Sequence, residues 1–259
     1  MISRLQVFCL VFLPSIGLSQ WDARGVSGVG MAGVADTNVR VGEGNPGSIS
    51  LRDGMTIVVG MLPGLFELRE LRRYGLAISL AGGGSGIEVH LLAYGGDLFS
   101  RYRGSLGIAT SVGSSTAMGI SIGVSEWRAK GYSALRELDV RVGGIYSEGP
   151  LRLGGRLRVD RLGTDRYLAS VTAGISFRLT SNAEVASELD QEPNKVVHSR
   201  YSFAFQPVWP LWLYLGWQDE PQRIGGGLSL AIGDGEVSYG ANWHSVLGWT
   251  HGLGLEVRP

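Results

Sequence analysis

The chain has 259 residues with 23 basic and 23 acidic side chains, so its formal net charge at pH 7 is zero. A chain without a basic surplus lacks the electrostatic footprint of a nucleic-acid-binding protein, and we expect no nucleic-acid partner. Glycine supplies 41 residues, about twice its usual share of roughly 7%, and no stretch has the roughly 18 consecutive apolar residues of a transmembrane helix.

Residues 1–19 are typical of a secretory signal peptide. Arg4 precedes an apolar run from Val7 to Leu13, and Gly17-Leu18-Ser19 supplies small residues for cleavage. The apolar run is too short to span a bilayer as a helix, which disfavours an N-terminal anchor. Cys9, the single cysteine, lies inside this segment. We therefore expect an exported protein whose mature chain has no cysteine chemistry.

Residues 20–53 form a glycine-rich segment whose apolar residues follow neither the helical nor the strand period. Gly28, Gly30 and Gly33 match the dinucleotide-binding string GxGxxG. That motif requires a buried strand before it and a helix after it, and residues 20–24 are not such a strand. We expect no nucleotide cofactor here, and we predict that the segment is not part of a sheet wall.

From Gly54 to the end of the chain, apolar and polar residues alternate with the period of a β-strand. The clearest hairpin is 151–179, where one face carries Leu, Val, Ile and Phe and the other carries Arg, Ser and Thr. Strands that cross an outer membrane on a tilt run about 9 to 11 residues, whereas soluble strands run about five or six. At roughly 15 residues per strand and turn, residues 54–259 predict about 14 strands.

The predicted strands are spread evenly along this region, and the weakest lies at 183–190, where acidic residues leave a thin apolar row. The strands are expected at 55–62, 66–81, 86–95, 102–111, 116–127, 135–146, 151–160, 167–179, 183–190, 199–209, 211–217, 224–232, 236–244 and 249–257. If the apolar rows face lipid, Arg at Leu157 or Val171 should impair assembly, and Arg at Ser170 or Thr172 should be better tolerated.

Aromatic and charged residues fall at characteristic places in these strands. Tryptophans near strand ends are typical of an aromatic girdle at the headgroups. They are Trp127, Trp209, Trp212, Trp217, Trp243 and Trp249. The rows opposite the apolar ones carry the charges Glu137, Asp139, Arg141, Arg152, Arg156, Arg158, Glu236 and His244. Such inward charges must pair or meet water. They form either a lining that anchors residues 20–53, through Arg24, Asp36 and Arg40, or a polar path for solute.

Catalytic and metal chemistry have little support in the sequence. The four histidines, His90, His198, His244 and His251, lie on separate predicted strands without the spacing of metal ligands. No local motif places a nucleophile beside a base. We expect no enzyme activity, no metal and no cofactor.

With the strands placed, the N-terminal segment resembles the start of FadL-like outer-membrane proteins and of the PorV and PorQ proteins of type IX secretion. The resemblance rests on Ala23-Arg24-Gly25, on the glycine-rich stretch Gly28–Ala35 and on Asn45-Pro46-Gly47, where Gly47 stands in place of the family's alanine. It implies a plug in the lumen with the motif residues Arg24, Gly28, Gly30, Gly33, Asn45 and Pro46, followed by a barrel. It also implies outer-membrane lipid as surroundings, and a hydrophobic small-molecule ligand or secretion-system components as partners.

The sequence therefore predicts an all-β protein, a transmembrane antiparallel β-barrel of about 14 strands with an N-terminal plug. Residues 1–19 are the signal peptide, 20–53 the plug and 54–259 the barrel in the outer membrane. The expected role is transport of hydrophobic small molecules or a secretion-associated function. Two alternatives remain open, namely a non-transporting structural or interaction barrel and a soluble periplasmic all-β protein.

Overall fold

The computed structural model describes residues 21–22, 34–35, 40–41, 44–64, 68–162, 166–193, 195–219 and 222–259. The predicted signal peptide 1–19 lies outside the described residues, as do the motif residues Arg24, Gly28, Gly30 and Gly33. In the part of the chain that is described, no helix is long and apolar enough to cross a membrane.

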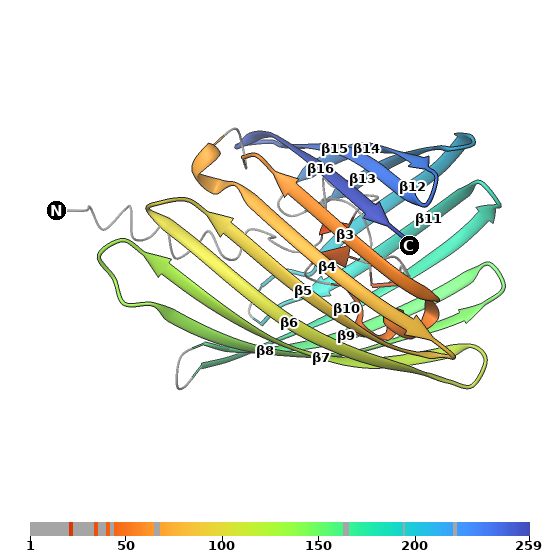
Figure 1. Ribbon diagram of the computed structural model, residues 1–259, viewed down its shortest axis with the longest axis horizontal. Helices are drawn as coiled ribbons and strands as arrows, with labels where there is room; N and C mark the ends of the chain where they lie inside the picture. The colour runs from red at the N-terminus through yellow and green to blue at the C-terminus, as the bar shows by residue number, and fades with distance from the viewer. Residues whose placement is uncertain are drawn as a thin grey trace.

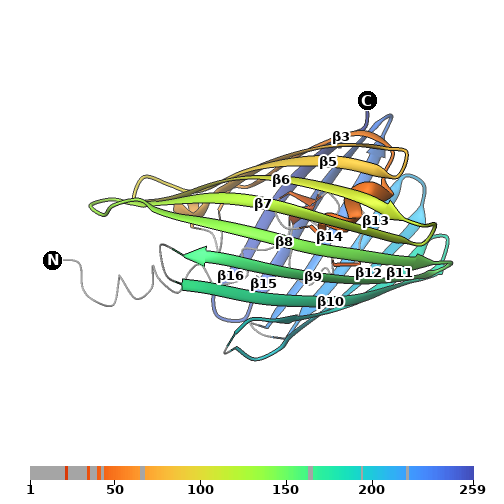
Figure 2. The ribbon, with the colours of Figure 1, turned by 90° about the horizontal axis from the view of Figure 1, so that it is seen from below.

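Fourteen antiparallel strands, β3 to β16, close into a single barrel (Figures 1 and 2). They are β3 (Gly54–Leu62), β4 (Arg73–Gly82), β5 (Ser85–Gly95), β6 (Phe99–Val112), β7 (Thr116–Ala129), β8 (Leu135–Glu148), β9 (Leu151–Leu162), β10 (Arg166–Thr180), β11 (Ala183–Gln191), β12 (His198–Val208), β13 (Leu211–Gln218), β14 (Arg223–Ile232), β15 (Gly235–His244) and β16 (Gly248–Val257). The predicted fold class and strand number are confirmed.

Neighbouring strands pair in sequence order, and β16 closes the barrel by pairing with β3, from Leu253 opposite Met61 to Val257 opposite Ile57. At one end, termed the turn end, connections are two or three residues long, and glycines such as Gly83 and Gly149 adopt positive φ there. At the other, termed the loop end, connections run from three to ten residues. Outer-membrane barrels place short turns in the periplasm and longer loops outside.

The two faces of the wall differ as the alternation predicts. Apolar side chains of the outer face are widely exposed, for example Leu80 at 55%, Leu157 at 45% and Val171 at 53%. The inner face carries polar and charged side chains that are largely buried, such as Thr172 at 1% exposed. An exposed apolar surface that extends around a closed barrel is typical of contact with lipid.

One boundary of the predicted strands is wrong, and the strand that was predicted with the thinnest apolar row is confirmed. The expected strand 66–81 starts only at Arg73, after a short 3₁₀ helix, η3 (Arg69–Leu71), because the charge-crowded residues before it belong to the connection at the loop end. The strand at 183–190, expected to be weak, forms in full as β11. Its acidic residues are compatible with the strand because they face inward, where Glu184 pairs with Arg152 and Glu188 pairs with Arg200.

Only four of the six tryptophans predicted to form an aromatic girdle lie on the outer face. Trp209, Trp217, Trp243 and Trp249 are exposed. Trp127 is only 8% exposed and points inward, and Trp212 shares the inner face of β13 with the buried Tyr214. The girdle prediction is wrong for these two residues because position near a strand end does not specify the face, whereas the parity along the strand does.

The described part of the N-terminal segment includes a two-stranded sheet of β1 (Trp21–Asp22) and β2 (Arg40–Val41) and a 3₁₀ helix, η2 (Pro46–Leu51). Helix η2 lies inside the barrel near the turn end, against β4 to β8 (Figure 1). Inner-face glycines make room for it, because a Cβ at Gly107 would lie 2.9 Å from the Ile49 side chain and a Cβ at Gly119 would lie 2.5 Å from the Pro46 carbonyl oxygen. These inner-face glycines thus permit the close approach of η2 to the wall.

Candidate functional site in the barrel lumen

The side chains predicted to line the lumen all lie on the inner face of their strands. Six of them are buried, and Glu137 and Arg158 are half-buried. The buried six are Asp139, Arg141, Arg152, Arg156, Glu236 and His244. Strand register brings them together in groups with charged residues from neighbouring strands, several of which the sequence interpretation did not single out.

On β6 and β8, one carboxylate serves two arginines. The Asp139 Oδ1 atom lies 2.7 Å from Arg103 Nη2 and 3.1 Å from Arg141 Nε. All three side chains are at most 4% exposed. Nearer the loop end, Arg101 and Glu137 form a second pair at 3.3 Å. Removal of one partner from such a buried set leaves a charge without compensation, so this group ties β6 to β8 firmly.

Strand β11 supplies the carboxylates on another part of the wall, three strands beyond β8. Glu184 pairs with Arg152 and accepts a hydrogen bond from Ser176 Oγ at 2.6 Å. Glu188 pairs with Arg200 at 2.5 Å. Arg156 donates to Thr172 Oγ1 at 3.1 Å, and Thr172 in turn donates to Asp190 at 2.7 Å. The acidic residues that weakened the sequence prediction of β11 are therefore its anchors.

The described N-terminal residues are bound to this polar lining. Asn45 caps η2 by accepting from the Gly47 backbone at 3.0 Å, and its Nδ2 donates to the Val34 carbonyl at 2.7 Å and to the Gly144 carbonyl of β8 at 2.9 Å. The Val34 backbone donates to Glu188 at 2.7 Å. At the other end of η2, Arg52 pairs with Glu88. Pro46 is buried as the first residue of η2.

At the loop end, three aromatic rings of β5 to β7 gather on the inner face. Tyr94 and Phe99 meet edge to face with ring centroids 5.9 Å apart, and Phe99 and Trp127 lie 5.6 Å apart. Guanidinium groups flank the rings, with Arg101 4.1 Å from the Trp127 ring and Arg73 5.7 Å from the Tyr94 ring. This aromatic cluster of Tyr94, Phe99 and Trp127 offers an apolar, π-rich surface inside an otherwise polar lumen.

Across strands β12 to β15, also at the loop end, cross-strand pairing places four polar residues in one row. Arg200 lies opposite Gln218, Gln218 opposite Arg223, and Arg223 opposite His244. All four are buried. The Nδ1 atom of His244 accepts from the backbone of Val246 at 3.1 Å, which leaves the hydrogen of a neutral imidazole on Nε2. The predicted strand 224–232 excludes Arg223 by one residue, although the parity of Arg223 with Gly225 marks it as inward.

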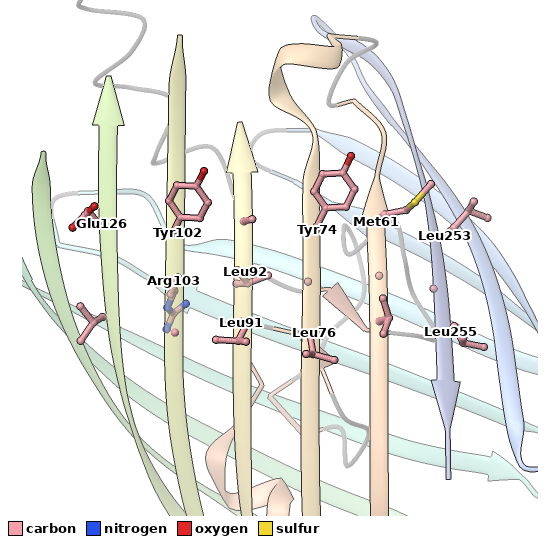
Figure 3. A pocket seen from close by; sticks show the side chains of 17 residues that line it. Met61, Tyr74, Leu76, Leu91, Leu92, Tyr102, Arg103, Glu126, Leu253 and Leu255 are labelled. Atoms are coloured by element: carbon pink, nitrogen blue, oxygen red, sulfur yellow. The ribbon is translucent and has the colours of Figure 1, made fainter. Parts of the chain in front are cut away.

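A separate hollow of about 860 Å³ lies on the wall formed by β16 and β3 to β7. Figure 3 shows Met61, Tyr74, Tyr102 and Leu253 on neighbouring strands of this wall. Tyr74 and Tyr102 are 47% and 49% exposed and belong to the outer face. The hollow is therefore part of the apolar outer surface and does not contribute a solute site in the lumen.

No group of three or more His, Cys, Asp or Glu side chains that could hold a metal ion occurs within the described ranges. No protein-family model matches the sequence. No curated protein is significantly similar to it in sequence.

The fold has close counterparts among solved structures. The chain is similar to the toluene transporter TbuX of Ralstonia pickettii, with a TM-score of 0.63 and 11% identity over 83% of this chain and 92% of that one. The chain is also similar to the monoaromatic hydrocarbon channel CymD, with a TM-score of 0.64 and 13% identity over 83% of this chain and 91% of that one. The comparison with the Pseudomonas putida toluene transporter TodX gives a TM-score of 0.61 and 10% identity over 90% of this chain and 94% of that one. At this identity the likeness concerns the fold, and the chain has the fold of these FadL-like channels; no PorV-type protein is among these counterparts.

Proposed function

We propose that the protein is an outer-membrane channel for small hydrophobic solutes, without enzyme activity. The observation that carries the proposal is the aromatic cluster of Tyr94, Phe99 and Trp127 inside the loop end of a barrel with the fold of hydrocarbon channels. Aromatic rings can stack on such a surface at the point where a solute would enter from outside. The exposed apolar outer face supports a location in the outer membrane.

In this proposal, residues 20–53 are a plug that closes the turn-end half of the lumen. Support comes from its described part, since Asn45 bonds the wall at Gly144 and Pro46 to Ser50 are buried. The motif residues Arg24, Gly28, Gly30 and Gly33 would belong to the same plug. The lining charges Glu137, Asp139, Arg141, Arg152, Arg156, Arg158, Glu236 and His244 would then hold wall and plug together and leave the loop-end half to the solute.

The second candidate is a barrel that does not transport and instead serves as a scaffold, for example for secretion components. The specific observation in its favour is the same occupation of the lumen, because η2 contacts five consecutive strands, β4 to β8, at the turn end. A scaffold would require no movement of this segment, whereas a channel requires a path past it.

Toluene uptake by Gram-negative cells separates the two candidates. Cells are preferable to liposomes because toluene crosses a plain phospholipid bilayer unaided. Cells that express the chain should accumulate labelled toluene faster than cells without it. The double variant Tyr94→Ala, Trp127→Ala should slow uptake, since each ring contributes about 1 kcal/mol to stacking. Tyr102→Ala, which removes a ring from the outer face, is the matched control. Equal uptake with and without the folded barrel would contradict transport and favour the scaffold.

A further inference from the structure

The outer face of the barrel carries a small basic group at the loop end of β7 and β8. The Glu126 carboxylate accepts hydrogen bonds from Arg128 Nε at 2.6 Å and from Arg136 Nε at 3.0 Å. Glu126 and Arg128 share the parity of the exposed Val124 along β7, and Glu126 lies opposite Arg136 in the strand register, so this group belongs to the outer face. Two guanidinium groups share one carboxylate, which leaves one positive charge in excess. We term Arg128 and Arg136 the arginine rim.

The arginine rim lies directly beyond the apolar surface of the wall. The next outer-face residues towards the turn end are Val124 on β7 and Leu138 on β8, which are cross-strand partners and are 53% and 40% exposed. The side chains of Arg128 and Arg136 are 63% and 78% exposed, so their charges are open to the surroundings. Where an apolar row meets a charged row on an outer-membrane barrel, those surroundings are lipid headgroups.

The hollow of about 860 Å³ on the outer wall adjoins this rim, since Tyr102, Val124 and Glu126 are among its lining residues. Tyr102 is the cross-strand partner of Glu126, and Figure 3 shows the two side chains at one level of neighbouring strands. Arg128 lies over the Tyr102 ring, with its Cζ atom 5.7 Å from the ring centroid. The lining below this level is mainly apolar and includes Leu91. A charged rim and an apolar hollow therefore meet on the same face of the wall.

We propose that this face binds a phosphorylated glycolipid of the outer leaflet, with a phosphate on Arg128 and Arg136 and an acyl chain in the hollow. The planar fork of a guanidinium matches a phosphate in a bidentate geometry, and the phosphate would supply negative charge that Glu126 alone does not. The hollow would remove apolar surface of the chain from water.

The position of the rim selects the leaflet. Longer connections of an outer-membrane barrel lie outside the cell, so the loop end places the rim in the outer leaflet. In a Gram-negative outer membrane that leaflet is built of a phosphorylated glycolipid. This inference rests on the proposed outer-membrane location and concerns a lipid partner, which the channel function does not require.

Native mass spectrometry of the full chain in detergent, titrated with diphosphoryl lipid A, tests the site. The double variant Arg128→Gln, Arg136→Gln should weaken lipid A binding about tenfold, because charge-assisted hydrogen bonds are lost. Arg178→Gln, Lys195→Gln is the matched control, since it removes two exposed cations that lie away from the rim. Resistance of the unheated barrel to SDS shows whether each variant has folded. Unchanged lipid A binding in the folded rim variant would overturn the site.

A second rim variant keeps both charges and removes the forks. Arg128→Lys, Arg136→Lys should give an affinity for lipid A between those of the wild type and the Gln variant. Wild-type affinity in the Lys variant would contradict the bidentate contact. If the Gln variant fails to fold, the Lys variant decides the site on this criterion.

Lipids that lack one half of the ligand separate the two parts of the site. Lipid A without its phosphates should bind the wild type about tenfold more weakly, and equal binding would overturn the role of the arginine rim. The deacylated glycolipid phosphate should also bind more weakly, and equal binding would overturn the role of the hollow. A barrel that assembles in membranes and does not bind lipid A refutes only this site. Rim-dependent lipid A binding without toluene uptake refutes only the transport proposal.

Discussion

Two groups of buried arginines on the inner wall differ in one respect. On β6 and β8, Arg103 and Arg141 share the carboxylate of Asp139, and all three side chains are almost fully enclosed. On β14, Arg223 is equally enclosed, yet no carboxylate of the described residues pairs with it, and its cross-strand neighbours are Gln218 and His244. In the first group a shared carboxylate joins two strands. At the second site the buried charge has no counter-charge among the described residues, so the two sites should respond oppositely when a charge is removed.

The largest effect is expected where the paired group is broken. Asp139→Asn should lower the free energy of unfolding by about 3 to 5 kcal/mol, because two buried guanidinium groups lose their shared counter-charge. Urea titration of the reconstituted barrel measures the change. Asp160→Asn is the control, because Asp160 is 22% exposed and its loss should cost less than about 1 kcal/mol. Equal losses would show that burial does not set the strength of these pairs.

A smaller loss is expected where the wall receives η2. Gly119→Ala places a Cβ 2.5 Å from the Pro46 carbonyl oxygen, and the overlap should cost about 2 kcal/mol of unfolding free energy. Gly155→Ala is the matched control, since a Cβ there meets nothing within 4 Å. If the two variants are equally stable, η2 does not pack against β7.

Asn45 tests the same contact from the side of the N-terminal segment. Asn45→Ala removes the donor to the Val34 and Gly144 carbonyls and the cap of η2. We expect a loss of about 1 to 2 kcal/mol, measured by the same urea titration. Asn182→Ala, in an exposed turn, should leave stability unchanged.

Arg223 should behave oppositely to Asp139. In the absence of any added carboxylate, Arg223→Met removes an uncompensated buried charge, so its unfolding free energy should equal that of the wild type or exceed it by about 1 kcal/mol. A loss as large as that of Asp139→Asn would mean that Arg223 has a structural partner.

The strands and their faces follow from the sequence because alternation is local, and one residue decides the face of the next. The ion pairs cannot be predicted from the sequence in this way, because they depend on the register between neighbouring strands. Glu184, Glu188 and Asp190 weaken β11 when the strand is considered alone, and they anchor it once Arg152 and Arg200 lie beside them. The lack of a described carboxylate beside Arg223 could not be predicted for the same reason, since it is visible only after the neighbouring strands are placed.

Register also changes one expectation about tolerance. Thr172 was expected to accept Arg better than the outer positions, but it is 1% exposed and links Arg156 to Asp190. An arginine there would break this chain. The inner-face position suited to the comparison is Ser170, which is only half-buried.

The central claim, that the apolar row of the barrel faces hydrocarbon, is tested most directly by membrane assembly of two adjacent variants on β10. Val171→Arg places a charge on the outer face, where Val171 is 53% exposed, and should cost about 2 to 4 kcal/mol of folding free energy in lipid. Ser170→Arg turns the same charge inward and should cost clearly less. Equal costs, or a greater cost for Ser170→Arg, would contradict the assigned faces and the channel built on them.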